Sequence, residues 1–295
     1  MNTENKKLSG LYRPEFERDN CGFGLIAHMD GTPSHWLVDT AIGALARLTH
    51  RGAIAADGKT GDGCGLLLKK PDSFLRAVAE TEGFKLAELY SAGMVFLNQD
   101  TKLAKQARDT LEKELKTEGL DVQGWRTVPT DESACGEEAL KSLPVIEQIF
   151  VNAADGMDQV SFERHLYIAR RRTEKAIEPN DPMFYIPSLS SSVISYKGLV
   201  MPEFLPVFYK DLGNKNLESA TAVFHQRFST NTWPQWRLAQ PFRYLAHNGE
   251  INTVQGNRNW SMARGHKFES PHMNMEDVRP LVSLTSSDSN SLDNM

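Results

Sequence analysis

The stretch from Met183 to Gln226 decides the fold class, because three apolar runs follow one another in it. They are Met183–Leu189 (MFYIPSL), Phe204–Tyr209 (FLPVFY) and Ala220–Gln226 (ATAVFHQ). Each run has the length and the β-branched or aromatic content of a strand. The intervals between them leave little room for the helical crossovers that parallel neighbours need. This half of the chain therefore predicts antiparallel sheet rather than a doubly wound parallel sheet.

Helices and further strands precede this stretch. Apolar residues recur every three or four positions in three segments, which is the helical period. The expected helices are Asp39–Leu48, Asp100–Lys116 and Ser161–Ile177. Asp39 or Thr40 is expected to cap the first helix, and Arg170–Arg172 to lie at the solvated end of the third. The remaining strand-like runs are Gly65–Leu68, Gly93–Leu97 and Val145–Val151.

Composition places the chain among ordinary globular proteins. Of its 295 residues, 40% are hydrophobic and 24% are charged, which excludes wholesale disorder. The net charge of −5 argues against a dedicated nucleic-acid surface, and no apolar run approaches the roughly 18 residues of a membrane helix. Three cysteines do not make a disulfide framework. These features predict a cytoplasmic protein without a nucleic-acid or membrane partner.

The composition changes sharply between Asn20 and Cys21. Residues 1–20 (MNTENKKLSGLYRPEFERDN) are polar, contain as many acidic as basic side chains, and lack the apolar core of a secretory signal. The next residues, Cys21–Ala27 (CGFGLIA), are small and apolar, as a buried strand would be. We therefore expect residues 1–20 to be a removable leader and residues 21–295 to form the functional domain.

Removal of this leader would give Cys21 both a thiol and a free α-amine. An α-amine has a pKa of roughly 7.7–8, so a neutral fraction exists at pH 7. The amine could then act as general base for the thiol, directly or through one water, without a His or Asp partner. Cys64 and Cys135 lack such a position, and no two cysteines have the CxxC spacing of a zinc site. Cys21 is therefore the candidate nucleophile.

Polar residues with catalytic potential follow the last strand-like run. Arg227 has the planar fork that binds a carboxylate, although an arginine is also typical of a surface ion pair. Asn248 and Gly249 offer an amide donor and an unhindered N–H, the parts of an oxyanion hole, and the same dipeptide is typical of a hairpin turn. His225 and His247 are interpreted as structural residues.

A further polar segment, Thr285–Asp293 (TSSDSNSLD), lies near the end of the sequence. Such a density of Ser, Asp and Asn is typical of a helix cap or a solvated loop. Asp288 acquires a function only if a substrate carries an ammonium group that needs a carboxylate partner. On the residues alone, both interpretations of this segment stay open.

Six short motifs occur in a fixed order along the chain. They are Cys21–Gly24 (CGFG), His50–Ala53 (HRGA), Thr60–Gly63 (TGDG), Phe224–Thr232 (FHQRFSTNT), His247–Glu250 (HNGE) and Ser287–Ser289 (SDS). Together they resemble the class II glutamine amidotransferases. The longer strings 50–65, 224–253 and 287–294 are similar, more narrowly, to the amidotransferase domain of the glutamate synthase large subunit. The resemblance covers residues 21–295 and implies an α+β fold, the N-terminal-nucleophile αββα sandwich of largely antiparallel sheets.

The resemblance implies a chemical role for the nucleophile and its neighbours. Cys21 matches the residue that attacks the side-chain amide of L-glutamine, which releases ammonia and leaves a γ-glutamyl thioester. Asn248 and Gly249 match the oxyanion-hole pair. Water then hydrolyses the thioester to glutamate, so the implied activity is that of a glutaminase.

The resemblance also implies how the substrate is bound. Arg227 matches the arginine that holds the α-carboxylate of glutamine, and Asp288 matches the carboxylate that receives its α-ammonium. Phe228 and Thr230 lie in the loop that closes over the substrate in relatives. A glutamine zwitterion gives Arg227 and Asp288 their complementary charges.

Cofactors and partners are implied for a region outside this sequence. In the family, the large subunit continues into a synthase region that converts 2-oxoglutarate to glutamate, carries FMN and an iron–sulfur cluster, and works with a small NADPH-oxidising subunit. The present residues offer no flavin site and no cluster-binding cysteine set. We therefore expect a C-terminally truncated sandwich that holds the glutaminase half alone.

Two other interpretations use the same residues. A different class II enzyme, such as one that forms a phosphoribosylamine or an amide sugar, would share the glutaminase site, although the string 224–253 favours glutamate synthase. A chain that keeps its leader would be an inactive glutamine-binding protein. The mass of the N-terminus distinguishes this last interpretation from the others.

Overall fold

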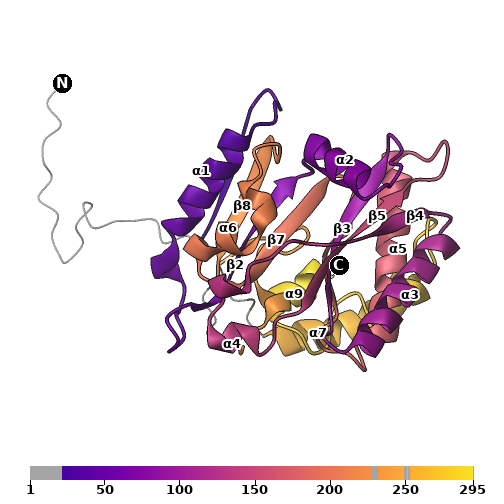
Figure 1. Ribbon diagram of the computed structural model, residues 1–295. Coiled ribbons are helices and arrows are strands. Elements are labelled where there is room, and N and C mark those ends of the chain that lie inside the picture. Colours follow the sequence, from indigo (N-terminus) through magenta and orange to yellow (C-terminus); the bar gives the residue numbers. More distant parts are fainter. Residues whose placement is uncertain (1–21, 228–231, 249–250, 252, 295) are drawn as a thin grey trace, which may run out of the picture.

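The computed structural model describes residues 22–227, 232–248, 251 and 253–294. Two four-stranded sheets lie face to face at the centre of the molecule, and helices cover their outer faces (Figure 1). The strands are β1 Phe23–Ala27, β2 Thr60–Lys69, β3 Tyr90–Leu97, β4 Asp121–Thr127, β5 Val145–Asn152, β6 Tyr185–Ser188, β7 Val193–Val200 and β8 Thr221–Gln226. The first sheet has the order β1-β8-β2-β7 and the second β4-β5-β3-β6, with antiparallel pairing throughout.

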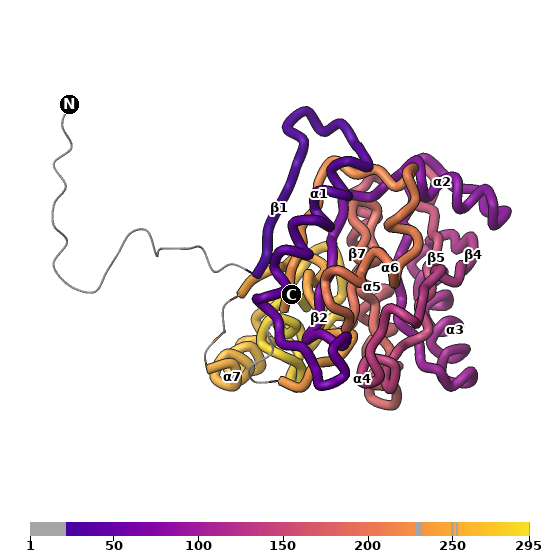
Figure 2. The backbone as a smooth tube through the Cα atoms, turned by 60° about the vertical axis from the view of Figure 1, so that its left-hand side comes forward, coloured from indigo at the N-terminus to yellow at the C-terminus, as the bar shows by residue number. Residues whose placement is uncertain are grey.

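The helices complete an αββα arrangement. Their bounds are α1 His35–Ala46, α2 Asp72–Thr81, α3 Thr101–Thr117, α4 Glu137–Leu140, α5 Gln159–Ile177, α6 Leu205–Phe208, α7 Val254–Arg264, α8 Met275–Val278 and α9 Asp288–Asp293. Helix α1 contacts β1 and β8 on one side, whereas α3 and α5 pack together on the second sheet. Figure 2 shows α7 at the lower end of the sandwich, away from α2 at its upper end. The expected mixed, largely antiparallel fold is therefore confirmed.

Strand β3 shows how the layers are built, because its alternate side chains face opposite directions. Met94 and Phe96 lie in the core between the two sheets, together with residues of β2 such as Leu66. Val95 and Leu97 lie in a second core, beneath α3 and α5. A strand buried on both faces needs a continuous apolar run, which is what the sequence has here.

Most strand-like runs are confirmed, and one is wrong. The residues expected as a strand at Phe204–Tyr209 form the end of a short 3₁₀ helix and then α6. Pro206 lies in the first turn of α6, and proline has no N–H to donate to a sheet. Strands β4 and β7 were not expected from the sequence, and β7 pairs with β2 in the first sheet.

Strand β1 is the expected strand after Cys21, but it is not buried. It lies at the edge of the first sheet, where Phe23 is 39% and Leu25 is 64% exposed. The expectation that this strand is buried was wrong, because apolar composition alone does not distinguish a central strand from an edge strand.

The three expected helices exist, with two corrections. Helix α1 begins before Asp39, and the hydroxyl of Ser34 caps it by accepting a hydrogen bond from the Leu37 amide at 3.2 Å. Arg170 and Arg171 are buried rather than solvated, because both pair with the buried carboxylate of Glu174 on the same helix. Local periodicity did not reveal this internal ion-pair cluster.

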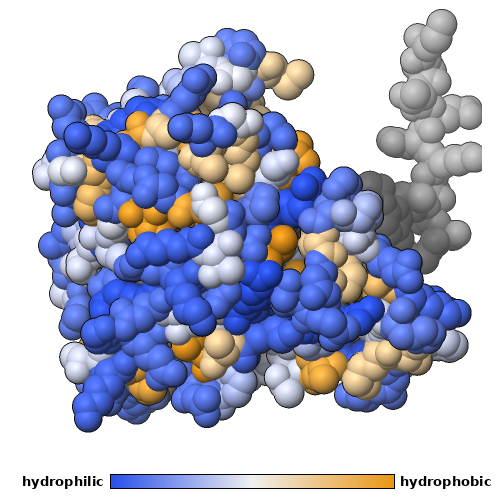
Figure 3. Space-filling view, turned by 90° about the vertical axis from the view of Figure 1, so that its right-hand side faces the viewer, coloured by the Kyte–Doolittle hydropathy of each residue, from blue (hydrophilic) through white to orange (hydrophobic). Residues whose placement is uncertain are grey.

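The surface on the side of α3 and β4 is mainly hydrophilic, with hydrophobic residues in small separate patches (Figure 3). Across the residues that the structure describes, no helix combines the length and the apolar character needed to cross a bilayer.

Candidate active site

Two of the described candidate residues, Arg227 and Asn248, lie where β8 ends and β1 begins, at one end of the first sheet. Phe23 pairs with His225, and the Gln226 amide donates to the carbonyl oxygen of Gly22 at 2.6 Å. The Arg227 amide then donates to the carbonyl oxygen of Gly63, at the start of β2, at 2.8 Å. The backbone therefore brings the residue that follows Cys21 next to the segment that carries Arg227.

The Arg227 guanidinium is held inside the protein, so Arg227 is not a surface arginine. It is 8% exposed, and its Nη1 donates to the carbonyl oxygen of Asp62 at 3.4 Å, while Nη2 donates to the hydroxyl of Thr232. Burial lowers the pKa of Arg227 from its usual value, and the carboxylates of Asp62 and Asp288 act in the opposite direction. Arg227 therefore lies within electrostatic range of Asp288.

Asp288 opens helix α9 and is fixed by backbone donors. Its Oδ2 accepts from the amide of Ile251 at 2.7 Å, and its Oδ1 accepts from the amide of Ser289 at 2.7 Å. The hydroxyl of Ser287 caps the same helix. The helix-cap interpretation is thus correct for Ser287, and the hydrogen bond to Ile251 ties Asp288 to the segment that follows the HNGE motif.

Asn248 lies against Gly22. A Cβ atom at residue 22 would be 2.8 Å from Oδ1 of Asn248 and 2.7 Å from the carbonyl oxygen of Gln226, so no side chain fits there. The side-chain amide of Asn248 is therefore close to the backbone beside Cys21. Oδ1 faces Gly22, and the same amide carries at Nδ2 a donor of the kind that binds an oxyanion.

The two histidines of this region make structural hydrogen bonds. Nε2 of His225 donates to the carbonyl oxygen of His247 at 2.9 Å, and burial lowers the pKa of His225 to about 4. The His247 amide donates to Oε1 of Gln240 at 3.2 Å. His225 is therefore neutral at pH 7 and holds the loop that leads to Asn248, which agrees with its interpretation as structural.

Close backbone packing beneath Arg227 explains the glycines of two motifs. A Cβ at Gly52 would lie 1.8 Å from Nε2 of Gln226. Gly63 has a φ of 123°, and a Cβ there would lie 2.8 Å from that of Ala239. The HRGA and TGDG motifs therefore serve to bring three backbone segments together at the site.

Lys197 is a site-supporting residue that sequence reasoning missed. Its fully buried amine donates to the carbonyl oxygens of Arg237 at 3.0 Å and Ala239 at 2.8 Å. Burial lowers the pKa of Lys197 well below its usual value. The only signal in the sequence is a lysine inside the apolar run of β7, since Ala239 is far away along the chain.

The two described cysteines are poor nucleophiles. Cys64 is fully buried, its thiol donates to the carbonyl oxygen of Val200 at 3.2 Å, and burial raises its pKa far above neutrality. Burial also raises the pKa of Cys135, to about 12. Both thiols are therefore protonated at pH 7. Within the described ranges, no group of three or more His, Cys, Asp or Glu side chains could hold a metal.

Four candidate residues, Cys21, Phe228, Thr230 and Gly249, lie outside the described residues. Of the predicted site, the structure describes Arg227, Asn248 and Asp288. Arg227 and Asn248 lie beside the backbone of Gly22 and Gln226, and Asp288 lies within electrostatic range of Arg227.

Comparison with known families decides the classification. The family model described as "Glutamine amidotransferases class-II" matches residues 21–295. The chain belongs to the class II glutamine amidotransferases. The match begins at Cys21, where the composition of the sequence changes, and includes every described residue of the candidate site.

Three relatives of this amidotransferase are much longer proteins. The chain is 44% identical to the glutamate synthase (NADPH) large chain of Bacillus subtilis over 98% of its length, and 45% identical to that of Azospirillum brasilense over 97%. It is 41% identical to the ferredoxin-dependent glutamate synthase 2 of Arabidopsis thaliana over 94%. The aligned regions cover 19%, 19% and 17% of these relatives, respectively, so the chain spans about a fifth of their length.

Proposed function

We propose that the chain is the glutaminase part of a glutamate synthase, which hydrolyses L-glutamine to glutamate and ammonia through a thioester on Cys21. The closeness of the Asn248 side chain to Gly22 carries this proposal, because it brings the amide that holds the Nδ2 donor next to the residue that follows the nucleophile. The relatives named above support glutamate synthase over class II enzymes that form a phosphoribosylamine or an amide sugar.

The reaction uses the two functional groups of an N-terminal cysteine. The free α-amine of Cys21 takes the thiol proton, and the sulfur attacks the side-chain amide carbon. The carbonyl electron pair moves to oxygen, where the Asn248 amide and the Gly249 N–H donate hydrogen bonds. The C–N bond then breaks, the leaving nitrogen takes the proton back from the α-ammonium of Cys21, and ammonia departs. Water then attacks the thioester carbon while the α-amine of Cys21 takes its proton; the C–S bond breaks, the sulfur receives that proton, and glutamate is released.

Substrate selection comes from the two ends of the glutamine zwitterion. The guanidinium of Arg227 binds the α-carboxylate, and the carboxylate of Asp288 receives the α-ammonium. Phe228 and Thr230 match residues of the loop that closes over the substrate in relatives. Because Arg227 is buried and Asp288 is fixed by backbone amides, both charges are oriented before glutamine arrives.

The ammonia is destined for a synthase region in the longer protein, where 2-oxoglutarate becomes glutamate. By the resemblance to the glutamate synthase large subunit, FMN, an iron–sulfur cluster and a small NADPH-oxidising subunit are proposed for that region. The polar leader without an apolar core supports a cytoplasmic location.

A chain that begins at Cys21 with a free amine is expected to hydrolyse L-glutamine and to release glutamate and ammonia in a one-to-one ratio. The measurement is enzymatic determination of both products, after mass spectrometry has established the N-terminus. L-Asparagine, which is one methylene shorter, is the control substrate and is expected to react far more slowly. Absence of hydrolysis by a folded chain with a free Cys21 would contradict the proposed function.

Arg227→Lys is expected to raise the KM for L-glutamine by at least about tenfold although the charge is kept. An ammonium group cannot form the paired hydrogen bonds with which a guanidinium binds a carboxylate. The variant's kcat should change less, because the α-carboxylate is remote from the reacting bond. Steady-state kinetics at constant enzyme concentration measure both constants, and unchanged kinetics would rule out this role for Arg227.

Asn248→Ala is expected to lower kcat by roughly 10²–10³-fold, with a smaller change in KM. The side-chain amide would stabilise negative charge that develops only as the bond to sulfur forms. Asn257→Ala, at an asparagine of α7, is a control that should retain normal turnover. A variant with normal kcat would show that Asn248 forms only the turn that its sequence also suggests.

A further inference from the structure

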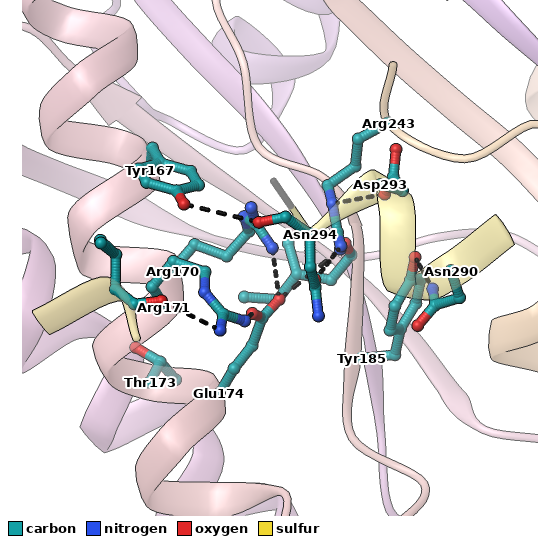
Figure 4. A network of polar contacts seen from close by, with 12 residues as sticks. Tyr167, Arg170, Arg171, Thr173, Glu174, Tyr185, Arg243, Asn290, Asp293 and Asn294 are labelled. Atoms are coloured by element: carbon teal, nitrogen blue, oxygen red, sulfur yellow. Dashed lines mark hydrogen bonds and ion pairs between the residues drawn. The ribbon is translucent and has the colours of Figure 1, made fainter. Parts of the chain in front are cut away.

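A buried network of charged side chains joins α5 to the loop before Asn248. Figure 4 shows the carboxylate of Glu174 pointing from α5 toward the guanidinium groups around it. It accepts hydrogen bonds from Arg170 at 2.7 Å and Arg171 at 2.5 Å, and its distance to Nη1 of Arg243 is 3.5 Å. Glu174 is only 2% exposed. It therefore fixes Arg243 from the side of the second sheet.

Arg243 continues the network into the C-terminal helix. Its Nε lies 3.0 Å from Oδ2 of Asp293, and its Nη2 donates to Oδ1 of Asn294 at 2.9 Å. The other carboxylate oxygen of Asp293 accepts from the backbone amide of Tyr244 at 3.0 Å. Both oxygens of Asp293 thus bind the loop at residues 243–244, which leads directly to Asn248.

The same helix carries the other half of the glutamine site. Asp288 is the first residue of α9 and Asp293 the last. A second contact holds α9 to strand β6 of the second sheet, where Nδ2 of Asn290 donates to the hydroxyl of Tyr185 at 3.3 Å. The position of Asp288 relative to Asn248 is therefore held from two sides, by the hydrogen bond from the Ile251 amide and by the link through Asp293 and Arg243.

The link between α5, residues 243–244 and α9 depends on buried charges. Burial alone would raise the pKa of Glu174, but the guanidinium groups of Arg170, Arg243 and Arg171 lower it to about 2, so the carboxylate is ionised. Buried ion pairs hold a precise geometry because a charge left without its partner is strongly unfavourable. The network is thus suited to fix two loops rather than to tolerate movement between them.

We propose that Arg243 and Asp293 are positioning residues that set the separation between the oxyanion donor Asn248 and the carboxylate of Asp288, and thereby select substrates with an α-ammonium. The proposal rests on the glutaminase function proposed above. Neither residue touches the substrate in this account. They act through Asn248 and Asp288, which do.

The test compares L-glutamine with glutaramate, which has the same amide and carboxylate but no α-ammonium. Asp293→Asn removes the charge that pairs with Arg243. It is expected to reduce the preference for L-glutamine, measured as the ratio of the two kcat/KM values, by about tenfold. In an Asp288→Ala background, the same substitution should leave the ratio unchanged. A uniform loss of folded protein would lower both kcat/KM values and leave their ratio unaltered.

Asp211→Asn is the matched control. Asp211 is also a buried carboxylate, paired with Arg126 at 2.7 and 2.9 Å, and this pair makes no contact with α9 among the described residues. The control should lower stability without changing the substrate preference. An Asp293→Asn chain with the wild-type preference, or a control with the same loss of preference, would overturn the proposal.

Arg243→Lys keeps the question answerable if Asp293→Asn does not fold. It keeps the positive charge that faces Asp293 but removes the guanidinium that also donates to Asn294. The proposal expects a smaller loss of preference, about twofold to threefold, and an unchanged ratio would overturn it. If the wild-type chain hydrolyses neither substrate, the proposed function fails. If it prefers L-glutamine and the variants keep that preference, only this inference fails.

Discussion

Replacing Cys21 by alanine is expected to abolish glutamine hydrolysis. The proposed reaction passes through a bond between the Cys21 sulfur and the substrate carbon, and alanine has no atom that can form it. The two other thiols cannot take over this step, because burial keeps both Cys64 and Cys135 protonated at pH 7. A serine variant is expected to be inactive as well. An α-amine with a pKa of roughly 7.7–8 is too weak a base to activate a hydroxyl, which is a far weaker nucleophile than a thiol.

The matched control for this prediction is Cys64→Ala. Its thiol makes one hydrogen bond in the core, so the variant should lose stability but keep glutaminase activity per folded molecule. Activity is measured as glutamate release, and the folded fraction by circular dichroism. If the Cys21→Ala chain stays active while the Cys64→Ala chain is inactive, the nucleophile has been assigned to the wrong cysteine.

A chain in which the Asn20–Cys21 bond cannot be cleaved is expected to have little or no glutaminase activity. While this bond is intact, the nitrogen of Cys21 belongs to an amide and has no basic lone pair, so it cannot take the thiol proton. Residues 1–20 are also joined covalently to the nucleophile, where they would hinder access of glutamine. The match of the family begins at Cys21, which supports this boundary.

Two chains test this prediction. One keeps residues 1–20 and resists cleavage, and the other begins with a Met that is removed from Cys21 after synthesis. Both N-termini are established by mass spectrometry before glutamine hydrolysis is compared. Equal rates for the two chains would show that the free α-amine is not the general base, and the N-terminal-nucleophile mechanism would be wrong for this protein.

The fold was predictable where local pattern and tertiary position agree. The run at residues 145–151 is apolar because β5 is buried on both faces, so its composition predicts its structure. The run at 204–209 has a similar composition but contains Pro206, which favours the first turn of a short helix. Arg170 and Arg171 are buried against Glu174, whose carboxylate also lies 3.5 Å from Arg243, a distant residue that helical periodicity cannot reveal.

The candidate site was predictable at the residues that carry reactive groups. Arg227, Asn248 and Asp288 have chemical functions that a motif displays, and the structure gathers them at one end of the first sheet. The supporting residues were not predictable in the same way. Gly22 excludes a side chain because Asn248 folds over it, and Lys197 holds a loop from another part of the chain. Such roles arise only when distant segments come together.

Mass spectrometric mapping of a covalent label tests the central claim most directly. The probe is an L-glutamine analogue whose side-chain amide is replaced by an electrophilic diazoketone. We predict one label per chain, on a peptide that begins at Cys21, and protection of this peptide by excess L-glutamine. A label on Cys64 or Cys135, or on a peptide that still contains Asn20, would contradict the account.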